Sequence, residues 1–245
     1  MPAKLVAANI EKSFASASGN LRVIAGIDLS IADGEFVAIV GPSGCGKTTL
    51  LNIMAGFEHP DRGHVTIDGR ARSRPSAKGI VISQQGSVFP WLTVQQNLTF
   101  GLNGHHVDKG ALARHYAKLV GLTGFENGYP YELSGGMLKR AELARALIVK
   151  PEILFMDEPL SALDALTSLQ MRAELRRILA EERHTCVLIT HDVEEAIQLA
   201  DRIIVLSQRP ATIQAVFAVP FEHPRKLAHP DLIELKAAIL REFGL

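Results

Sequence analysis

Short apolar segments recur along the chain, and turn-forming or charged residues separate them. Glu35–Val40, Ile153–Met156 and Cys186–Thr190 are apolar at almost every position. Such runs without alternation are typical of strands that are covered on both faces. Longer segments with polar faces, Asp164–Glu182 and Asp192–Ala200, follow such runs and favour helices. This succession predicts an α/β fold whose core contains a mostly parallel sheet.

The N-terminal region has a different pattern, in which apolar and polar residues alternate. Ile27–Ile31 and His64–Gly69 alternate in this way, which is typical of strands with one exposed face. The small and polar residues of Ser16–Asn20 predict a hairpin loop. We therefore predict an N-terminal antiparallel β subdomain, with further strands at Gly79–Ser83 and Ile203–Leu206.

A helical region interrupts the strand pattern. The strand signal is weak from about Val94 to Gly128, and Ala111–Gly121 has helical spacing. Ser134–Val149 is a stronger helix pattern, with Ser134 suited to the N-cap position. We expect one domain, made of a core (1–84 and 150–210), an inserted α-helical subdomain (about 85–149) and a short tail (211–245) that ends in a helix.

The charge balance and the cysteines indicate an intracellular protein without a nucleic-acid partner. The 245-residue chain has 26 Lys and Arg against 26 Asp and Glu, so its formal net charge is zero. Cys45 and Cys186 are poorly placed for a disulfide, which favours a reducing compartment. No apolar stretch is long enough to cross a bilayer, and no signal core is present. We expect a cytoplasmic protein that can still dock on a membrane partner.

The segment from Gly41 to Thr49 carries the clearest chemistry. It follows the apolar run Glu35–Val40 and opens a helical segment. Its glycines let backbone N–H groups turn around phosphate oxygens, and the helix N-terminus adds its positive end. Lys47 can reach the terminal phosphates, and the Thr48 hydroxyl can ligate Mg²⁺. This segment, the phosphate loop, predicts a nucleotide site formed by Gly41, Pro42, Ser43, Gly44, Cys45, Gly46, Lys47, Thr48 and Thr49.

Two carboxylates follow Ile153–Met156, at the strand end where α/β sheets bind ligands. We expect Asp157 to hold Mg²⁺ through a water molecule and Glu158 to polarise the water that attacks the γ-phosphate. An Asp-Glu pair alone is more often a solvated turn, but the preceding strand and the phosphate loop favour the catalytic interpretation. His191 follows the strand Cys186–Thr190 in a similar place, where it can contact the γ-phosphate.

A second potential anion site stands at the start of a predicted helix. It consists of Ser134, Gly135 and Gly136, whose N–H groups face outward from a helix N-terminus. A Ser-Gly-Gly segment alone is more often a loop and a cap. Arg140 and Arg145 follow it, and the carboxylate pair comes next, which favours a functional role. A single nucleotide site has no evident use for this second element.

The order of these motifs resembles the nucleotide-binding subunit of ATP-binding cassette (ABC) transporters. The order is phosphate loop, glutamine loop, Leu-Ser-Gly-Gly (133–136), Asp-Glu-Pro (157–159), Ser-Ala-Leu-Asp (161–164) and Thr-His-Asp (190–192), and it covers essentially the whole chain. The resemblance implies the ABC ATPase fold, with a P-loop NTPase core, and two ATP molecules bound between two head-to-tail subunits. Ser134, Gly135, Gly136 and Asp164 then contact the ATP held by the partner subunit.

The resemblance also implies further contacts. Gln84 matches the glutamine loop that contacts Mg²⁺ and senses the membrane partner, although the neighbouring Gln85 leaves the assignment open by one residue. Phe14 fits the aromatic residue that stacks on adenine, and its alternative is an ordinary core residue at a strand end. Val88–Leu92 supplies candidate residues for docking the permease's coupling helix, or equally for packing the helical insertion.

Finer features resemble the nitrate, sulfonate and taurine importers, namely Phe89–Val94, Asn97 and Asp201–Pro210. This implies a second ATP-binding subunit, in a homodimer or with a close relative, integral membrane permease subunits and a periplasmic or lipid-anchored solute-binding protein. It also implies ATP and Mg²⁺ as cofactors and a peripheral place at the cytoplasmic face of the inner membrane. Other subunits bind the solute, so its identity stays open. Leu138 and Lys139 depart from the basic residue and glutamine usual in the family.

Two other classes of function are weaker alternatives. A soluble ABC ATPase acting on ribosomes or a cytosolic assembly usually has two cassettes or long inserts, and this sequence has neither. A small-molecule kinase would use the phosphate loop but has no use for Ser134–Gly136 or His191. The sequence therefore favours an ATPase subunit of a solute importer.

Overall fold

The computed structural model describes residues 3–16, 19–84, 86–102, 108–161, 163–182 and 184–245. Gln85 lies outside these ranges. The chain divides into two compact units, unit 1 with residues 1–76 and 184–245 and unit 2 with residues 77–183. None of the described helices combines the length and apolarity that a membrane-spanning helix needs. The predicted division into core, helical subdomain and tail stays a prediction.

The first sheet of unit 1 is the antiparallel subdomain predicted from alternation. In it β1 (Ala3–Ser16) pairs with β2 (Gly19–Ala32) on one side and with β4 (Arg62–Ile67) on the other, and β5 (Arg70–Ala71) extends β4. The pattern predicted short strands here, whereas β1 and β2 each have 14 residues. Register shifts along the β1–β2 pair explain the difference, because each shift interrupts the two-residue alternation without ending the strand.

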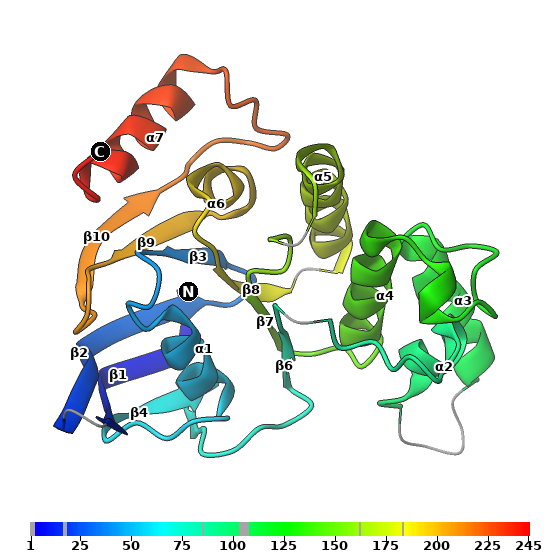
Figure 1. Cartoon of the computed structure of the whole chain (residues 1–245), viewed down its shortest axis with the longest axis horizontal. Helices are drawn as coiled ribbons and strands as arrows, with labels where there is room; N and C mark the ends of the chain where they lie inside the picture. The colour runs from blue at the N-terminus through cyan, green and yellow to red at the C-terminus, as the bar shows by residue number, and fades with distance from the viewer. Residues whose placement is uncertain (1–2, 17–18, 85, 103–107, 162, 183) are drawn as a thin grey trace. The chain divides into compact units, whose positions relative to one another are not determined.

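The second sheet of unit 1 positions the phosphate loop. Its central strand β3 (Phe36–Val40) runs parallel to β8 (Thr185–Ile189) on one side and to β9 (Arg202–Leu206) on the other. Every residue of β3 and β8 is buried, as expected for strands covered on both faces. Unit 1 also contains the helices α1 (Lys47–Ala55), α6 (Val193–Leu199) and α7 (Pro230–Arg241) (Figure 1).

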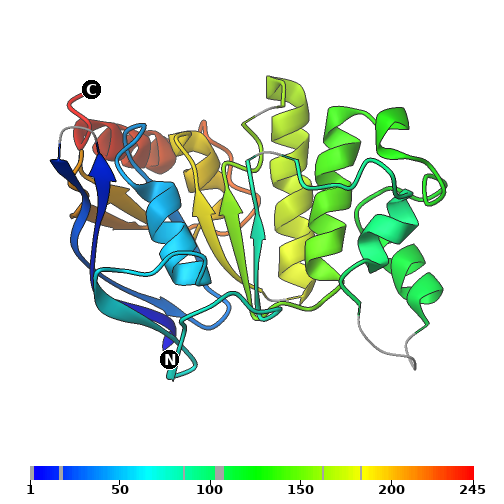
Figure 2. The same ribbon diagram turned by 60° about the horizontal axis from the view of Figure 1, so that its bottom comes forward.

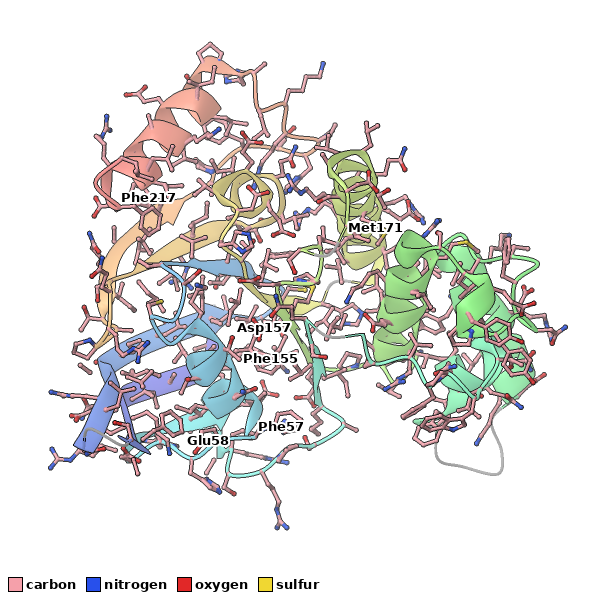
Figure 3. The ribbon with its side chains drawn as sticks, in the orientation of Figure 1. Phe57, Glu58, Phe155, Asp157, Met171 and Phe217 are labelled. Atoms are coloured by element: carbon pink, nitrogen blue, oxygen red, sulfur yellow. The ribbon has the colours of Figure 1, made fainter. Side chains whose placement is uncertain are left out.

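One strand of this sheet was not predicted. It is β10 (Ile213–Ala218), which pairs antiparallel with β9. The nearby Pro210 and Pro220 hid it, because prolines usually mark loops. Its residues alternate between half-buried and exposed, and Phe217 lies between the strand and α7 (Figure 3).

Unit 2 combines two parallel strands with a group of helices. The strands are β6 (Gly79–Ile82) and β7 (Ile153–Asp157), and the helices are α2 (Val94–Thr99), α3 (Lys109–Leu119), α4 (Gly135–Leu147) and α5 (Ala165–Glu182), with a 3₁₀ turn at Pro130–Glu132. Both views show α4 beside α5 (Figures 1 and 2). The helix α2 was not predicted, because six residues are too few to show helical periodicity.

Candidate active site

The phosphate loop leaves the central strand β3 and needs glycine at two positions. Gly44 and Gly46 have φ angles of +72° and +121°, in a region that other residues adopt only with strain. A Cβ atom on Gly46 would lie 2.8 Å from Cγ1 of Val23 on β2. The loop therefore keeps its backbone close to β2, and it leads directly into α1.

Lys47 and the start of α1 place positive charge at this loop. Lys47 is only 6% exposed, and its Nζ donates to the carbonyl oxygens of Gly41 at 2.8 Å and of Pro42 at 3.0 Å. Gly46 supplies no side-chain cap to α1, whose first turn contains no acidic residue. A phosphate accepts stronger hydrogen bonds from an ammonium than neutral carbonyls do. The loop, Lys47 and the helix end therefore fit a phosphate group.

His191 shares an edge of the sheet with the phosphate loop. The parallel register aligns Ile39 of β3 with Ile189 of β8, so the carboxyl ends of both strands lie together. The exposed His191 follows β8, and Asp192 caps α6 by accepting the N–H of Glu194 at 2.8 Å. The structure thus places His191 within unit 1 at the edge where sequence reasoning expected a phosphate contact.

Phe14 lies near the end of β1 and presents part of its ring to solvent. The residue is 37% exposed, and Nζ of Lys12 lies 5.0 Å from the ring centroid. Burial lowers the pKa of Lys12, but bonds and attraction from Glu58 and Asp61 outweigh it and raise the pKa above its ordinary value. Phe14 therefore has a charged group on one face, and its exposure is greater than that of an ordinary core residue.

Unit 2 brings Gln84 and Glu158 together. Parallel pairing aligns Ile82 of β6 with Met156 of β7, so the residues after both strands meet at one edge. Nε2 of Gln84 donates to Oε2 of Glu158 at 3.3 Å. Asp157 ends β7 and is half-buried, while Phe155 on the same strand is fully buried. Figure 3 labels both residues.

The backbone of Glu158 is strained. Its φ of +46° is uncommon for a residue with a side chain, and such strain is concentrated at functional sites. The hydroxyl of Ser161 donates to the Glu158 carbonyl at 3.0 Å and helps to hold this conformation. The strain supports the catalytic interpretation of Glu158 over an ordinary solvated turn.

The predicted trans-acting residues lie together at the starts of α4 and α5. Ser134 caps α4, its Oγ accepting the N–H of Met137 at 3.3 Å, and Asp164 accepts the N–H of Thr167 at 3.0 Å. Hydrogen bonds from Thr167 lower the pKa of Asp164 below its ordinary value. A Cβ on Gly136 would lie 2.9 Å from Cγ2 of Thr167, so the two helix starts need glycine to approach this closely.

Sequence reasoning missed the contacts that join α4 to the segment after Gln84. Lys139 donates to Oε2 of Glu142 at 3.0 Å and to the carbonyl of Gln84 at 3.4 Å, and Glu142 accepts the N–H of Ser87. Arg145 donates to the carbonyl of Ser87 at 2.6 Å. Burial lowers the pKa of Arg145, and the charge of Glu142 opposes this shift. The sequence pointed to this region only through the departure at Lys139 and the presence of Arg145 after Ser134–Gly136.

Sequence reasoning also missed Arg209, which contacts the phosphate loop. It lies beyond β9 and donates twice to the carbonyl of Gly44. In the sequence, Asp201–Pro210 indicates only the importer group, and no motif chemistry points to the Arg209 side chain.

Comparisons with known proteins identify the family. The family model for the ABC transporter matches residues 24–161. An uncharacterized ABC transporter ATP-binding protein of Methanocaldococcus jannaschii is 41% identical over 243 residues, covering 98% of this chain and 91% of the relative. The aliphatic sulfonates import ATP-binding protein SsuB of Bacillus thuringiensis is 37% identical, with coverage of 96% and 93%. The bicarbonate transport ATP-binding protein CmpD of Synechocystis is 38% identical, with coverage of 89% and 79%.

A solved structure of an ATP-binding cassette has the same fold as this chain. The dimeric ATP-binding cassette MJ0796, in a post-hydrolysis state bound to ADP and Pi, has a TM-score of 0.76 and 29% identity to this chain. The likeness covers 89% of this chain and 100% of that one. The predicted ABC ATPase fold, with a mostly parallel sheet, an antiparallel β subdomain and helices, is therefore confirmed. The chain belongs to the ABC transporter family and is an ATP-binding cassette that hydrolyses ATP.

Proposed function

We propose that this ATPase powers an importer for a small solute of the nitrate, sulfonate and taurine group. The names of two relatives, at 37% and 38% identity, refer to sulfonate import and bicarbonate transport. The hydrogen bond between Gln84 and Glu158 is the observation that carries the proposal. It connects the catalytic carboxylate to a segment that continues to the half-buried Phe89 and the exposed Trp91.

The side chains of the candidate active site account for the chemistry at ATP. The phosphate loop and Lys47 bind the phosphates, and Glu158 accepts a proton from the attacking water. His191 contacts the γ-phosphate, and Phe14 stacks on adenine. Mg²⁺, when bound, neutralises charge on the β- and γ-phosphates.

The residues proposed for Mg²⁺ fit its preferences. Thr48, Gln84 and Asp157 offer a hydroxyl, an amide oxygen and a carboxylate, and Mg²⁺ prefers oxygen ligands of these kinds. Mg²⁺ keeps several water molecules, which agrees with Asp157 acting through one of them. Gln84 also donates to Glu158, so the same amide group joins the metal ligands to the catalytic base.

Ser134, Gly135 and Gly136 act on the ATP of a second subunit, and Asp164 lies beside them. The dimeric neighbour bound to ADP and Pi supports a two-subunit arrangement. The closeness of the two helix starts in unit 2 supports a joint role for these residues. ATP binding favours the closed dimer, and hydrolysis releases it, because ATP and ADP differ in affinity for the closed state.

An aromatic cluster near Gln84 is suited to the permease. The Phe89 ring lies 5.4 Å from that of Trp91 and 4.5 Å from that of Phe100, measured between centroids. Trp91 is 69% exposed and Phe100 is 63% exposed. Exposed apolar side chains that gather in this way mark docking surfaces. We propose that a helix of the permease binds here, next to the segment that contacts Glu158.

Glu158→Gln tests this function in a complex reconstituted with the proposed permease and solute-binding subunits. The variant keeps the shape of the side chain but cannot accept a proton, so uptake of labelled solute should fall at least a hundredfold. ATP binding should persist. Glu174→Gln, which changes a carboxylate on α5, is the matched control and should leave uptake unchanged. Uptake near the wild-type level by Glu158→Gln would contradict the catalytic assignment.

A further inference from the structure

We propose that Arg209 is a positioning residue of the phosphate loop, which fixes the Gly44–Cys45 peptide in the orientation that phosphate binding requires. The proposal deepens the ATPase function above and rests on it. Nε and Nη2 of Arg209 donate to the carbonyl oxygen of Gly44 at 3.1 and 2.8 Å. Hydrogen bonds from a charged donor are about twice as strong as neutral ones.

The position of the strands explains how Arg209 reaches the loop. The register of β3 and β9 aligns Val40 with Val205, so the segment after β9 starts at the same edge as the phosphate loop (Figure 1). The strand on the other side of β3 is β8, which leads to His191. The segments that follow the two strands beside β3 therefore flank the phosphate loop. One of these segments contains His191, and the other contains Arg209.

The segment that carries Arg209 is firmly anchored. Ala211 is fully buried, and its N–H donates to the carbonyl of Val23 at 2.8 Å. Val23 is also the residue whose Cγ1 would meet a Cβ on Gly46. One residue of β2 thus supports Arg209 and limits the other end of the phosphate loop. The backbone next to the exposed Arg209 is therefore anchored, and its side chain reaches Gly44 from there.

Fixing one carbonyl determines where the next amide points. A peptide group is planar, so the Cys45 N–H must point away from the Gly44 carbonyl. Without Arg209, Gly44 has the freedom to rotate this peptide, because it is a glycine at φ +72°. The Cys45 N–H now donates to Pro42 at 3.3 Å, a long bond that a phosphate oxygen can replace. Arg209 thereby keeps a donor directed into the loop.

Binding of ADP to the full-length chain, measured by calorimetry, tests the proposal. We expect Arg209→Ala to weaken binding about tenfold, which is less than the full loss of a hydrogen bond to a charged group because Arg209 acts on the nucleotide only through the loop. Gln208→Ala, at the exposed neighbouring position, is the matched control and should bind like wild type. Because the lost contact is the same in ground and transition states, KM for ATP should rise while kcat stays within about twofold.

Two further measurements separate positioning from other roles. Arg209→Lys keeps the charge but not the paired donors, so it should restore binding only in part and fold as wild type. A complete rescue by Arg209→Lys, with a loss in Arg209→Ala that disappears at high salt, would show long-range attraction only and overturn the proposal. A lower unfolding temperature of Arg209→Ala without nucleotide, with unchanged KM, would show a merely structural contact and also overturn it.

The outcomes distinguish this inference from the proposed function. Lys47→Ala should lose ADP binding if the phosphate loop is the nucleotide site. If Lys47→Ala loses binding and Arg209→Ala binds like wild type, the positioning role is wrong and the site stands. If the wild-type chain binds no ADP, both proposals fail together.

Discussion

The smallest features of the phosphate loop determine whether it can receive a phosphate. Lys47 is buried and bonded to two carbonyl oxygens of its own loop, so its ammonium is already in place. Gly44 and Gly46 adopt backbone angles that glycine reaches without strain. These needs are steric, and the sequence predicted them, because a glycine-rich segment between a strand and a helix leaves few other conformations.

Gly46→Ala should therefore be more harmful than alanine at a glycine with open surroundings. At Gly46 an added Cβ would have a left-handed φ and would lie 2.8 Å from Val23, and the two costs add together. We expect the unfolding free energy to fall by about 2–4 kcal/mol and the ADP affinity to fall at least tenfold. Gly69 has φ +71° and no atom within 4 Å of an added Cβ, so Gly69→Ala should cost about 1 kcal/mol. Equal urea midpoints for the two variants would contradict the steric argument.

At the scale of whole elements, the sequence predicted the strands and helices better than the contacts between them. The apolar runs that became β3 and β8 are buried at every residue, as their patterns required. The strand β10 and the helix α2 were missed because prolines and short length remove the periodic signal. The ion pair of Lys139 with Glu142 could not be predicted, because three-residue spacing on a helix does not tell which face is covered.

That ion pair should matter for unit 2, because its side chains are only 10% and 2% exposed. Glu142→Leu leaves Lys139 buried without its partner, and we expect a loss of about 3 kcal/mol in unfolding free energy. Lys139→Met should cost a similar amount for the same reason. The double variant should lose clearly less than the sum, since two apolar groups can pack together where two charges were paired. Urea unfolding of the four proteins measures this coupling, and strictly additive losses would refute it.

For the whole molecule, the sequence established the family and left the solute open. The motif order covered the chain, and the ABC ATPase fold was confirmed. The site residues fall into two sets within the chain. Unit 1 contains the phosphate loop and His191, and unit 2 contains Gln84, Glu158, Ser134–Gly136 and Asp164. Sequence patterns cannot show which residues act on which copy's ATP, because that depends on how two chains associate.

Mixed dimers can show whether the site is shared between two copies. One chain carries Lys47→Ala and the other Ser134→Arg, and both carry Glu158→Gln so that bound ATP is retained. If Ser134 acts on the partner's ATP, one site of the heterodimer has both defects and the other has none. We therefore expect about one trapped ATP per heterodimer purified through two different tags, and no trapped ATP in either homodimer. If Ser134 acts within its own chain, each site keeps one defect, and a heterodimer without ATP would contradict the shared site.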